Sequence, residues 1–180
     1  MITKLINLLT FSRIIFAIVI FIFLALEQNY LFALLLFFIS GLTDFFDGFL
    51  ARKYKTSSEL GEILDPLADK ILIIFVFIGL AVNLSSFVIG FAASLIISRE
   101  IWISVLRDFN ARNNNTNATK VIYIAKIKTS IQLFTIFIYL CGLVINNMLL
   151  IIIGDIFIVI SVLITIYTGY IYTKNSFNKN

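Results

Sequence analysis

The stretch "TDFFDGFLARKYKTSSELGEILDPLADK" occupies residues 43–70 of a chain that consists mostly of apolar side chains. It places four aspartates, Asp44, Asp47, Asp65 and Asp69, at the ends of two apolar segments. Carboxylates at membrane depth are costly, and they are usually paired or functional. The four aspartates are therefore expected either to pair with cations or to belong to a functional site.

The composition places the chain in a lipid bilayer. Hydrophobic residues fill 61% of the 180 positions and charged residues 13%, which excludes an ordinary soluble globular protein. Six apolar runs are each long enough to cross a hydrocarbon core of about 30 Å, and backbone groups in lipid need partners within the same segment, so all six are expected to be helices. The predicted spans are residues 8–26, 31–51, 61–83, 86–107, 123–145 and 149–172. The predicted fold class is all-α: a polytopic membrane protein of six transmembrane helices, forming a single domain over residues 1–180.

The first apolar run has two interpretations, a cleaved signal peptide or a retained span. No small-residue cleavage site follows it, and Glu27, Gln28 and Asn29 lead directly into the next run, so we expect a retained span. The breaks after the first, third and fifth spans contain no Lys or Arg, whereas the opposite ends carry nearly all of them. The positive-inside rule therefore predicts cytoplasmic termini in a multi-pass protein of the inner (cytoplasmic) membrane, with the acidic segments near its cytoplasmic face.

Helical spacing allows the four aspartates to meet. Asp44 and Asp47 are three residues apart, and Asp65 and Asp69 are four apart, so each pair shares one helix face. Counted from the connecting loop at about 1.5 Å per residue, Asp47 and Asp65 lie at one depth, and Asp44 and Asp69 lie somewhat deeper. Four such carboxylates repel one another, and bound cations are the simplest way to neutralise them. The chain has no histidine, so carboxylate ligands favour Mg²⁺ or Mn²⁺, and four of them suit two ions.

Two divalent ions that bracket the attacking and leaving oxygens are a recognised arrangement for phosphoryl chemistry. Small residues at Gly48, Ala51 and Gly61 would let a phosphate-bearing ligand approach the helix backbones. Basic residues on the other spans are candidates for binding an anionic co-substrate; they are Arg13, Arg99, Lys126 and Lys128.

The spacing of these residues matches a known sequence signature. The series Asp44-x2-Asp47-Gly48-x2-Ala51-Arg52-x8-Gly61-x3-Asp65-x3-Asp69 resembles the complete signature of the CDP-alcohol phosphatidyltransferase family. Outside the signature, the segments NLLTFSR (7–13), SRE (98–100) and AKIKT (125–129) look like those of the bacterial phosphatidylglycerophosphate synthases within that family. The resemblance covers nearly the whole chain.

The resemblance implies a membrane enzyme, as a homodimer without a nucleic-acid partner, that transfers a phosphatidyl group from CDP-diacylglycerol to sn-glycerol 3-phosphate and releases CMP. It implies that the metal ligands are Asp44, Asp47, Asp65 and Asp69, and that Asp69 is also the general base toward the acceptor hydroxyl. The implied CDP-binding residues are Gly48, Ala51, Arg52 and Gly61. The implied ligands of the acceptor phosphate are Arg13, Arg99, Lys126 and Lys128.

Two alternatives stay open. Relatives within the family use other acceptors, including serine, inositol phosphate and phosphatidylglycerol, although the basic residues favour a phosphorylated one. A cation or proton transporter would also bury carboxylates. Its acidic residues should lie near the midplane with access from both faces, whereas these aspartates lie toward one end of their spans.

Overall fold

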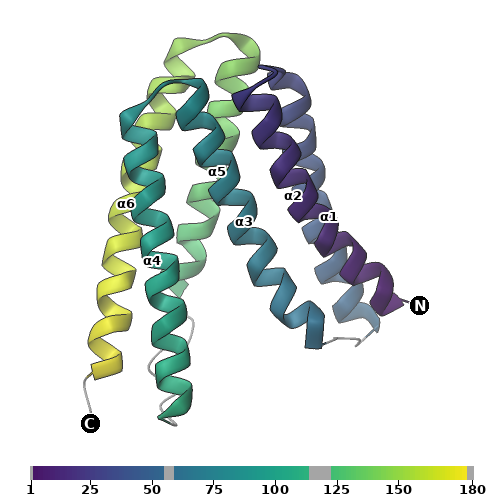
Figure 1. Cartoon of the computed structure of the whole chain (residues 1–180), viewed down its shortest axis with the longest axis vertical. Helices are drawn as coiled ribbons and strands as arrows, with labels where there is room; N and C mark the ends of the chain where they lie inside the picture. The colour runs from purple at the N-terminus through teal and green to yellow at the C-terminus, as the bar shows by residue number, and fades with distance from the viewer. Residues whose placement is uncertain (1, 55–58, 114–122, 178–180) are drawn as a thin grey trace.

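The computed structural model describes residues 2–54, 59–113 and 123–177, and all regular structure in these residues is helical. The six helices are α1 (Ile2–Ala25), α2 (Tyr30–Tyr54), α3 (Glu59–Asn83), α4 (Phe87–Arg112), α5 (Tyr123–Ile145) and α6 (Met148–Phe177). They run up and down in sequence, so the first turn of α1 and the last turn of α6 lie at the same end of the bundle (Figure 1). The prediction of six helices is confirmed.

The helices form a closed ring in which each packs against two neighbours. The order around the ring is α1, α2, α5, α6, α4 and α3, and α3 also contacts α5 across it. Three short connections close one end of the bundle. Each contains one non-glycine residue with positive φ, namely Gln28, Ser85 and Asn146, which lets the chain reverse within a few residues. At one of these turns the Ser86 hydroxyl caps α4 by accepting a hydrogen bond from the amide of Ile89 at 3.3 Å.

The predicted spans and the observed helices agree within one residue at the end with the short connections. At the opposite end most helices run further than predicted: α1 begins at Ile2 rather than residue 8, and α4 ends at Arg112 rather than residue 107. Apolar runs measure the thickness of the hydrocarbon core, whereas a helix can continue into water once it is nucleated. Hydropathy therefore does not predict the helix ends that extend beyond the hydrocarbon core.

Five of the helices contain a segment that is long and apolar enough to cross a membrane. These segments are Ile6–Ala25, Tyr30–Leu50, Phe87–Arg112, Ile127–Ile145 and Met148–Phe177. The exception within the described residues is α3, which carries Asp65, Asp69 and Lys70 along its length. The protein is therefore a multi-pass membrane protein. Phe45, Phe46 and Phe49 lie off the acidic face of α2 and are exposed on the outside of the bundle.

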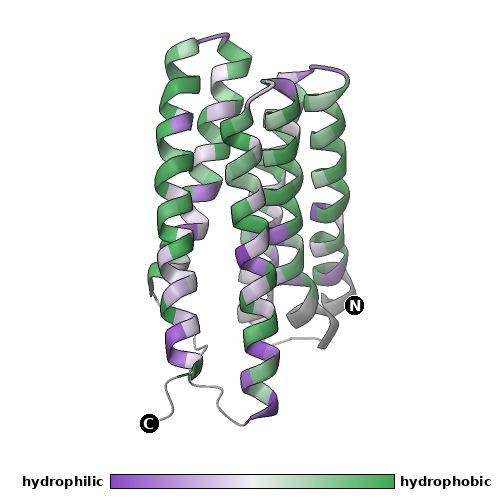
Figure 2. Ribbon diagram, turned by 60° about the vertical axis from the view of Figure 1, so that its left-hand side comes forward, coloured by the Kyte–Doolittle hydropathy of each residue, from purple (hydrophilic) through white to green (hydrophobic). Residues whose placement is uncertain are grey.

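The apolar core lies in the half of the bundle nearest the short connections. It is built from side chains of all six helices, including Ala17, Ile20, Ala33, Val76, Phe77, Ile89, Ala93, Ile136, Leu140 and Ile158. Most hydrophilic positions within the helices lie in the other half (Figure 2). The bundle is thus divided into a packed apolar half and a polar half, and the candidate site lies in the latter.

Close packing in the apolar half depends on one glycine of α6. A Cβ atom at Gly154 would lie 2.7–2.9 Å from ring atoms of Tyr139, a fully buried residue whose hydroxyl donates a hydrogen bond to Asp155 at 2.6 Å. Because the Tyr139 ring is closely packed and its hydroxyl is hydrogen-bonded, moving the ring away from an added Cβ would cost free energy.

We expect Gly154→Ala to destabilise the bundle by about 1–3 kcal/mol through overpacking. Thermal unfolding of the purified protein in detergent measures the effect. Gly90→Ala is the matched control, because a Cβ at Gly90 meets only Ala81, at an ordinary contact distance of 3.8 Å. Equal unfolding temperatures for the two variants would contradict this account of the packing.

Candidate active site

The four aspartates converge, as the helical spacing predicts, and an arginine of α1 lies between them. Nη1 of Arg13 lies 2.6 Å from both Asp44 Oδ1 and Asp69 Oδ1. Nη2 lies 2.7 Å from Asp47 Oδ2 and 3.3 Å from Asp65 Oδ1. Each of the two terminal guanidinium nitrogens therefore joins one carboxylate of α2 to one carboxylate of α3. The pairs are those expected from depth, with Asp47 opposite Asp65 and Asp44 opposite Asp69.

A stripe of buried residues along α1 explains how Arg13 reaches this position. The buried residues of α1 alternate at spacings of four and three: Ile6, Thr10, Arg13, Ala17, Ile20 and Leu24. This is the pattern of a helix face packed between neighbours, and α1 packs against both α2 and α3. The pattern was present in the sequence, but we had grouped Arg13 with the ligands of the acceptor phosphate. The structure places its guanidinium against the aspartates.

Thr10 is a member of the cluster that the sequence analysis missed. Its hydroxyl lies 2.6 Å from Asp65 Oδ1 and 3.4 Å from Asp47 Oδ2, one helical turn from Arg13. Its position on the buried stripe, three residues before a basic residue, was the available signal. Thr10 and Arg13 together touch all four aspartates, so α1 organises the acidic faces of both neighbouring helices.

The donor set fits hard divalent ions. Four carboxylates and one hydroxyl supply only oxygen ligands, and the single guanidinium leaves the cluster with three formal negative charges in excess. Among the described residues, no group of three or more Asp, Glu, His or Cys side chains is arranged around a metal-ion position. The guanidinium explains this, because it fills the space between the oxygens.

The predicted CDP-binding residues flank the cluster. Gly48 follows Asp47 on α2 and is partly exposed, and Gly61 lies one turn before Asp65 on α3 and is buried. Ala51 and Arg52 belong to the last turns of α2, and their side chains lie outside the described part of the structure.

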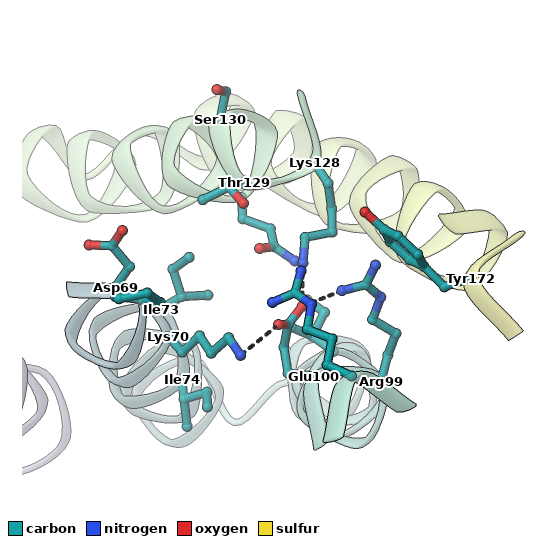
Figure 3. Close-up of a pocket in the computed structure, with 14 residues that line it drawn as sticks. Asp69, Lys70, Ile73, Ile74, Arg99, Glu100, Lys128, Thr129, Ser130 and Tyr172 are labelled. Atoms are coloured by element: carbon teal, nitrogen blue, oxygen red, sulfur yellow. Dashed lines mark hydrogen bonds and ion pairs between the residues drawn. The ribbon is translucent and has the colours of Figure 1, made fainter. Parts of the chain in front are cut away.

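A second charged group lies on the other side of Asp69 and is centred on Glu100 of α4. Its carboxylate contacts Lys128 of α5, Nη1 of Arg99 at 2.9 Å and Nζ of Lys70 at 3.5 Å. In Figure 3 these three cations point toward Glu100 from three different helices. Arg99 and Lys128, both predicted ligands of the acceptor phosphate, therefore lie together at Glu100, and the side chain of Lys126 lies outside the described part of the structure.

The α6 helix fixes Arg99 in this group. Nη2 of Arg99 donates a hydrogen bond to Thr168 Oγ1 at 3.1 Å, and its guanidinium lies 5.6 Å from the ring centroid of Tyr172. A Cβ at Gly169 would lie only 3.3 Å from the Arg99 side chain, so the glycine lets the arginine lie close to α6.

Two cavities meet at Asp69. The polar cavity has a volume of about 410 Å³, and its charged lining residues are Asp69, Lys70, Arg99, Glu100, Arg107 and Lys128. The apolar cavity has a volume of about 260 Å³ and is lined mainly by α2, α3 and α5; its lining includes Arg13, Phe37, Phe38, Gly41, Asp44, Asp69, Leu72 and Phe137. Asp69, Ile73 and Thr129 border both. One carboxylate therefore faces a basic cavity and an apolar cavity at once.

The fold and the site define a class: an integral membrane protein whose acidic cluster adjoins a basic cavity suited to anionic ligands. Comparison with known proteins makes this specific, because the family model described as CDP-alcohol phosphatidyltransferase matches residues 4–167. The chain therefore belongs to the CDP-alcohol phosphatidyltransferase family, a family of enzymes. This membership favours the enzyme over the transporter interpretation.

Curated relatives share most of the chain. A protein of Blochmanniella floridana is 40% identical over 144 residues, which are 79% of this chain and 74% of the relative. A protein of Wigglesworthia glossinidia brevipalpis is 39% identical over 132 residues, 72% of each chain. A protein of Rickettsia bellii is 39% identical over 141 residues, 78% of this chain and 76% of the relative. All three are named CDP-diacylglycerol–glycerol-3-phosphate 3-phosphatidyltransferase.

We expect Glu100→Ala to destabilise the protein, because Lys128 and Arg99 would lose the carboxylate that neutralises them. Removing one partner of a buried pair costs about 3–5 kcal/mol, and the adjoining cavity should bring the loss toward the lower end of that range. Thermal or denaturant unfolding in detergent measures it. The matched control on the same helix is Asp108→Ala, which breaks only an exposed pair with Arg112 (2.8 Å) and should cost less than about 0.5 kcal/mol. Similar losses in the two variants would contradict the central role of Glu100.

Proposed function

We propose that the protein transfers a phosphatidyl group from CDP-diacylglycerol to sn-glycerol 3-phosphate, giving phosphatidylglycerophosphate and CMP. The named activity of the relatives supports the choice of donor and acceptor. The observation that carries the proposal is the position of Asp69 between a basic and an apolar cavity. A reaction between a lipid and a small phosphorylated alcohol needs such a junction.

The acidic cluster is the proposed metal and diphosphate site. Asp44, Asp47, Asp65 and Asp69 would hold two Mg²⁺ or Mn²⁺ ions. When bound, such ions would neutralise the charge of a diphosphate. Next to the cluster, Gly48, Ala51, Arg52 and Gly61 would bind the CDP moiety, and the missing side chain at the partly exposed Gly48 would let this moiety approach the backbone of α2.

The basic cavity is the proposed site of the acceptor phosphate. Lys128 and Arg99 line it, and a dianionic phosphate there would be shared between cations that Glu100 already holds in place. Lys126 of α5 is proposed as a further ligand of this phosphate. Serine carries a single carboxylate in place of a dianionic phosphate and would neutralise these cations less completely. The cavity therefore favours a phosphorylated acceptor.

Asp69 is the proposed general base. Its carboxylate would take the proton of the acceptor hydroxyl as the hydroxyl oxygen attacks the phosphorus that carries the diacylglycerol. The bond from this phosphorus to the bridging oxygen of CMP breaks on the opposite side, and CMP leaves with the electron pair. The position of Asp69 on the borders of both cavities suits this role.

The apolar cavity is the proposed seat of hydrocarbon from the lipid donor. It begins at Asp44 and is lined by Phe37, Phe38 and Leu72. A Cβ built at Gly41 meets nothing within 4 Å, so this glycine does not serve close helix packing; it keeps the cavity open. A donor whose diphosphate lies at the aspartates would extend its acyl region into this space.

The distribution of Lys and Arg supports a proposed orientation in the membrane, and the family resemblance supports a proposed oligomeric state. We propose that all six helices, α3 included, cross the inner (cytoplasmic) membrane, with both termini and the two cavities facing the cytoplasm, where glycerol 3-phosphate and the released CMP are soluble. We also propose a homodimer.

The reaction is tested by CMP release from CDP-diacylglycerol with Mg²⁺ and each acceptor supplied in turn. We expect product with glycerol 3-phosphate and none with serine, inositol phosphate or phosphatidylglycerol, identified by mass spectrometry of the lipid. Asp69→Asn should lower kcat by at least about 10² while binding of CDP-diacylglycerol is retained, because the Asn side-chain oxygen can still ligate a metal ion but cannot take the proton of the acceptor. Unchanged CMP release in this variant would overturn the assignment of the base, and a different preferred acceptor would overturn that of the substrate.

We expect Gly41→Leu to raise the KM for long-chain CDP-diacylglycerol about 30-fold, because the new side chain displaces two or three buried methylenes worth about 0.8 kcal/mol each. The KM for glycerol 3-phosphate should stay unchanged. Ile39→Phe is the control, since Ile39 is an exposed residue of the same helix that does not line the cavity. An unchanged KM for the lipid in Gly41→Leu would mean that its chains bind elsewhere.

A further inference from the structure

We propose that Arg13 is an internal counter-cation, which holds the four aspartates together in the metal-free protein and competes with divalent ions for their oxygens. The inference rests on the proposed metal binding by the aspartates. It adds a role for a residue that the sequence analysis had assigned to the acceptor phosphate.

The contacts of Arg13 carry the inference. Its two terminal nitrogens lie 2.6–3.3 Å from four carboxylate oxygens on two helices. These carboxylates are the proposed ligands, and an oxygen that accepts a short hydrogen bond from a guanidinium cannot direct the same lone pair at a metal ion. The cation of Arg13 and a divalent ion between the same oxygens would also repel each other. Occupancy by one therefore disfavours occupancy by the other.

The charge balance argues against a permanent structural ion pair. One guanidinium faces four carboxylates, and its Nε is buried without a hydrogen-bond partner among the described residues. A purely structural arginine would be expected to satisfy its donors with fewer anions. The excess of three negative charges leaves the cluster able to attract further cations even while Arg13 is in place.

Burial gives the two cations different routes to the cluster. Arg13 approaches from the packed face of α1 and is fully buried, whereas the side chains of Asp44, Asp65 and Asp69 are 54%, 45% and 45% exposed. Ions can therefore reach the carboxylates from the open side. Arg13 also borders the apolar cavity, which gives its side chain space to withdraw without leaving Asp44. A withdrawn guanidinium would stay close enough to meet an anionic donor.

The test is a Mn²⁺ titration of the full-length protein in detergent without substrates, in which the electron paramagnetic resonance signal reports free Mn²⁺. We expect Arg13→Gln to bind Mn²⁺ at least about tenfold more tightly than the wild type, within the range of typical coupling between sites. Lys174→Gln is the matched control, because it removes an exposed positive charge near the same end of the bundle without touching the aspartates, and it should stay within about twofold. Equal or weaker binding by Arg13→Gln, or no binding by either protein, overturns the proposal.

Two further variants cover the case in which Arg13→Gln does not fold. Arg13→Lys keeps the charge but cannot span four carboxylates, so its Mn²⁺ affinity should lie between those of the wild type and a neutral variant. In Arg13→Ala, added guanidinium ions should weaken Mn²⁺ binding, whereas equal sodium should not, and the wild type should show no such difference. An Arg13→Lys affinity equal to that of the wild type, together with no guanidinium effect in Arg13→Ala, overturns the proposal. Because no turnover is measured, this failure is distinguishable from failure of the proposed function, which CMP release by the wild type decides.

Discussion

Mutual repulsion between four carboxylates inside a helical bundle is the constraint on which the polar half of this protein depends. Two acidic helix faces approach each other only if a cation lies between them. Arg13 provides that cation, and it does so because α1 packs between α2 and α3 with a buried stripe at spacings of three and four. The position of α1 in the ring is thus tied to the charge of the site as well as to apolar packing.

The division of the bundle into two halves separates stability from chemistry. The half near the short connections is filled by apolar side chains from all six helices, and Gly154 there allows a tyrosine ring to pack against α6. The other half contains the acidic cluster, the Glu100 group and the two cavities. Open space near charged groups is costly in a core, so the packed half has to hold the helices in register while the polar half stays accessible.

The sequence predicted the helices and their acidic faces. It did not predict the features that depend on contacts between helices. Six helices, the two acidic faces and the pairing of Asp47 with Asp65 follow from length and from 3.6 residues per turn. The position of Arg13 between the aspartates does not follow from length or periodicity. Sequence rules for basic residues place them at the membrane surface. Glu100 adjoins Arg99 in the sequence, but its contacts with Lys70 and Lys128 follow only from knowing that α3, α4 and α5 meet. The helix ends were predicted wrongly because hydropathy indicates the length that lies in the hydrocarbon core and not the full length of the helix.

The two charged groups are opposite in sign and share a border, which bears on how one site handles two anionic substrates. Four carboxylates against one guanidinium make the cluster on α2 and α3 negative and selective for cations. Lys70, Arg99, Arg107 and Lys128 outnumber Asp69 and Glu100 in the lining of the adjoining cavity, which makes this cavity positive and attractive to anions. An anion that arrives alone is repelled by the first group and attracted by the second, whereas an anion accompanied by divalent ions is accepted by the first. In the proposed reaction the opposite fields would sort donor from acceptor, and Asp69 lies on the border where the two would meet.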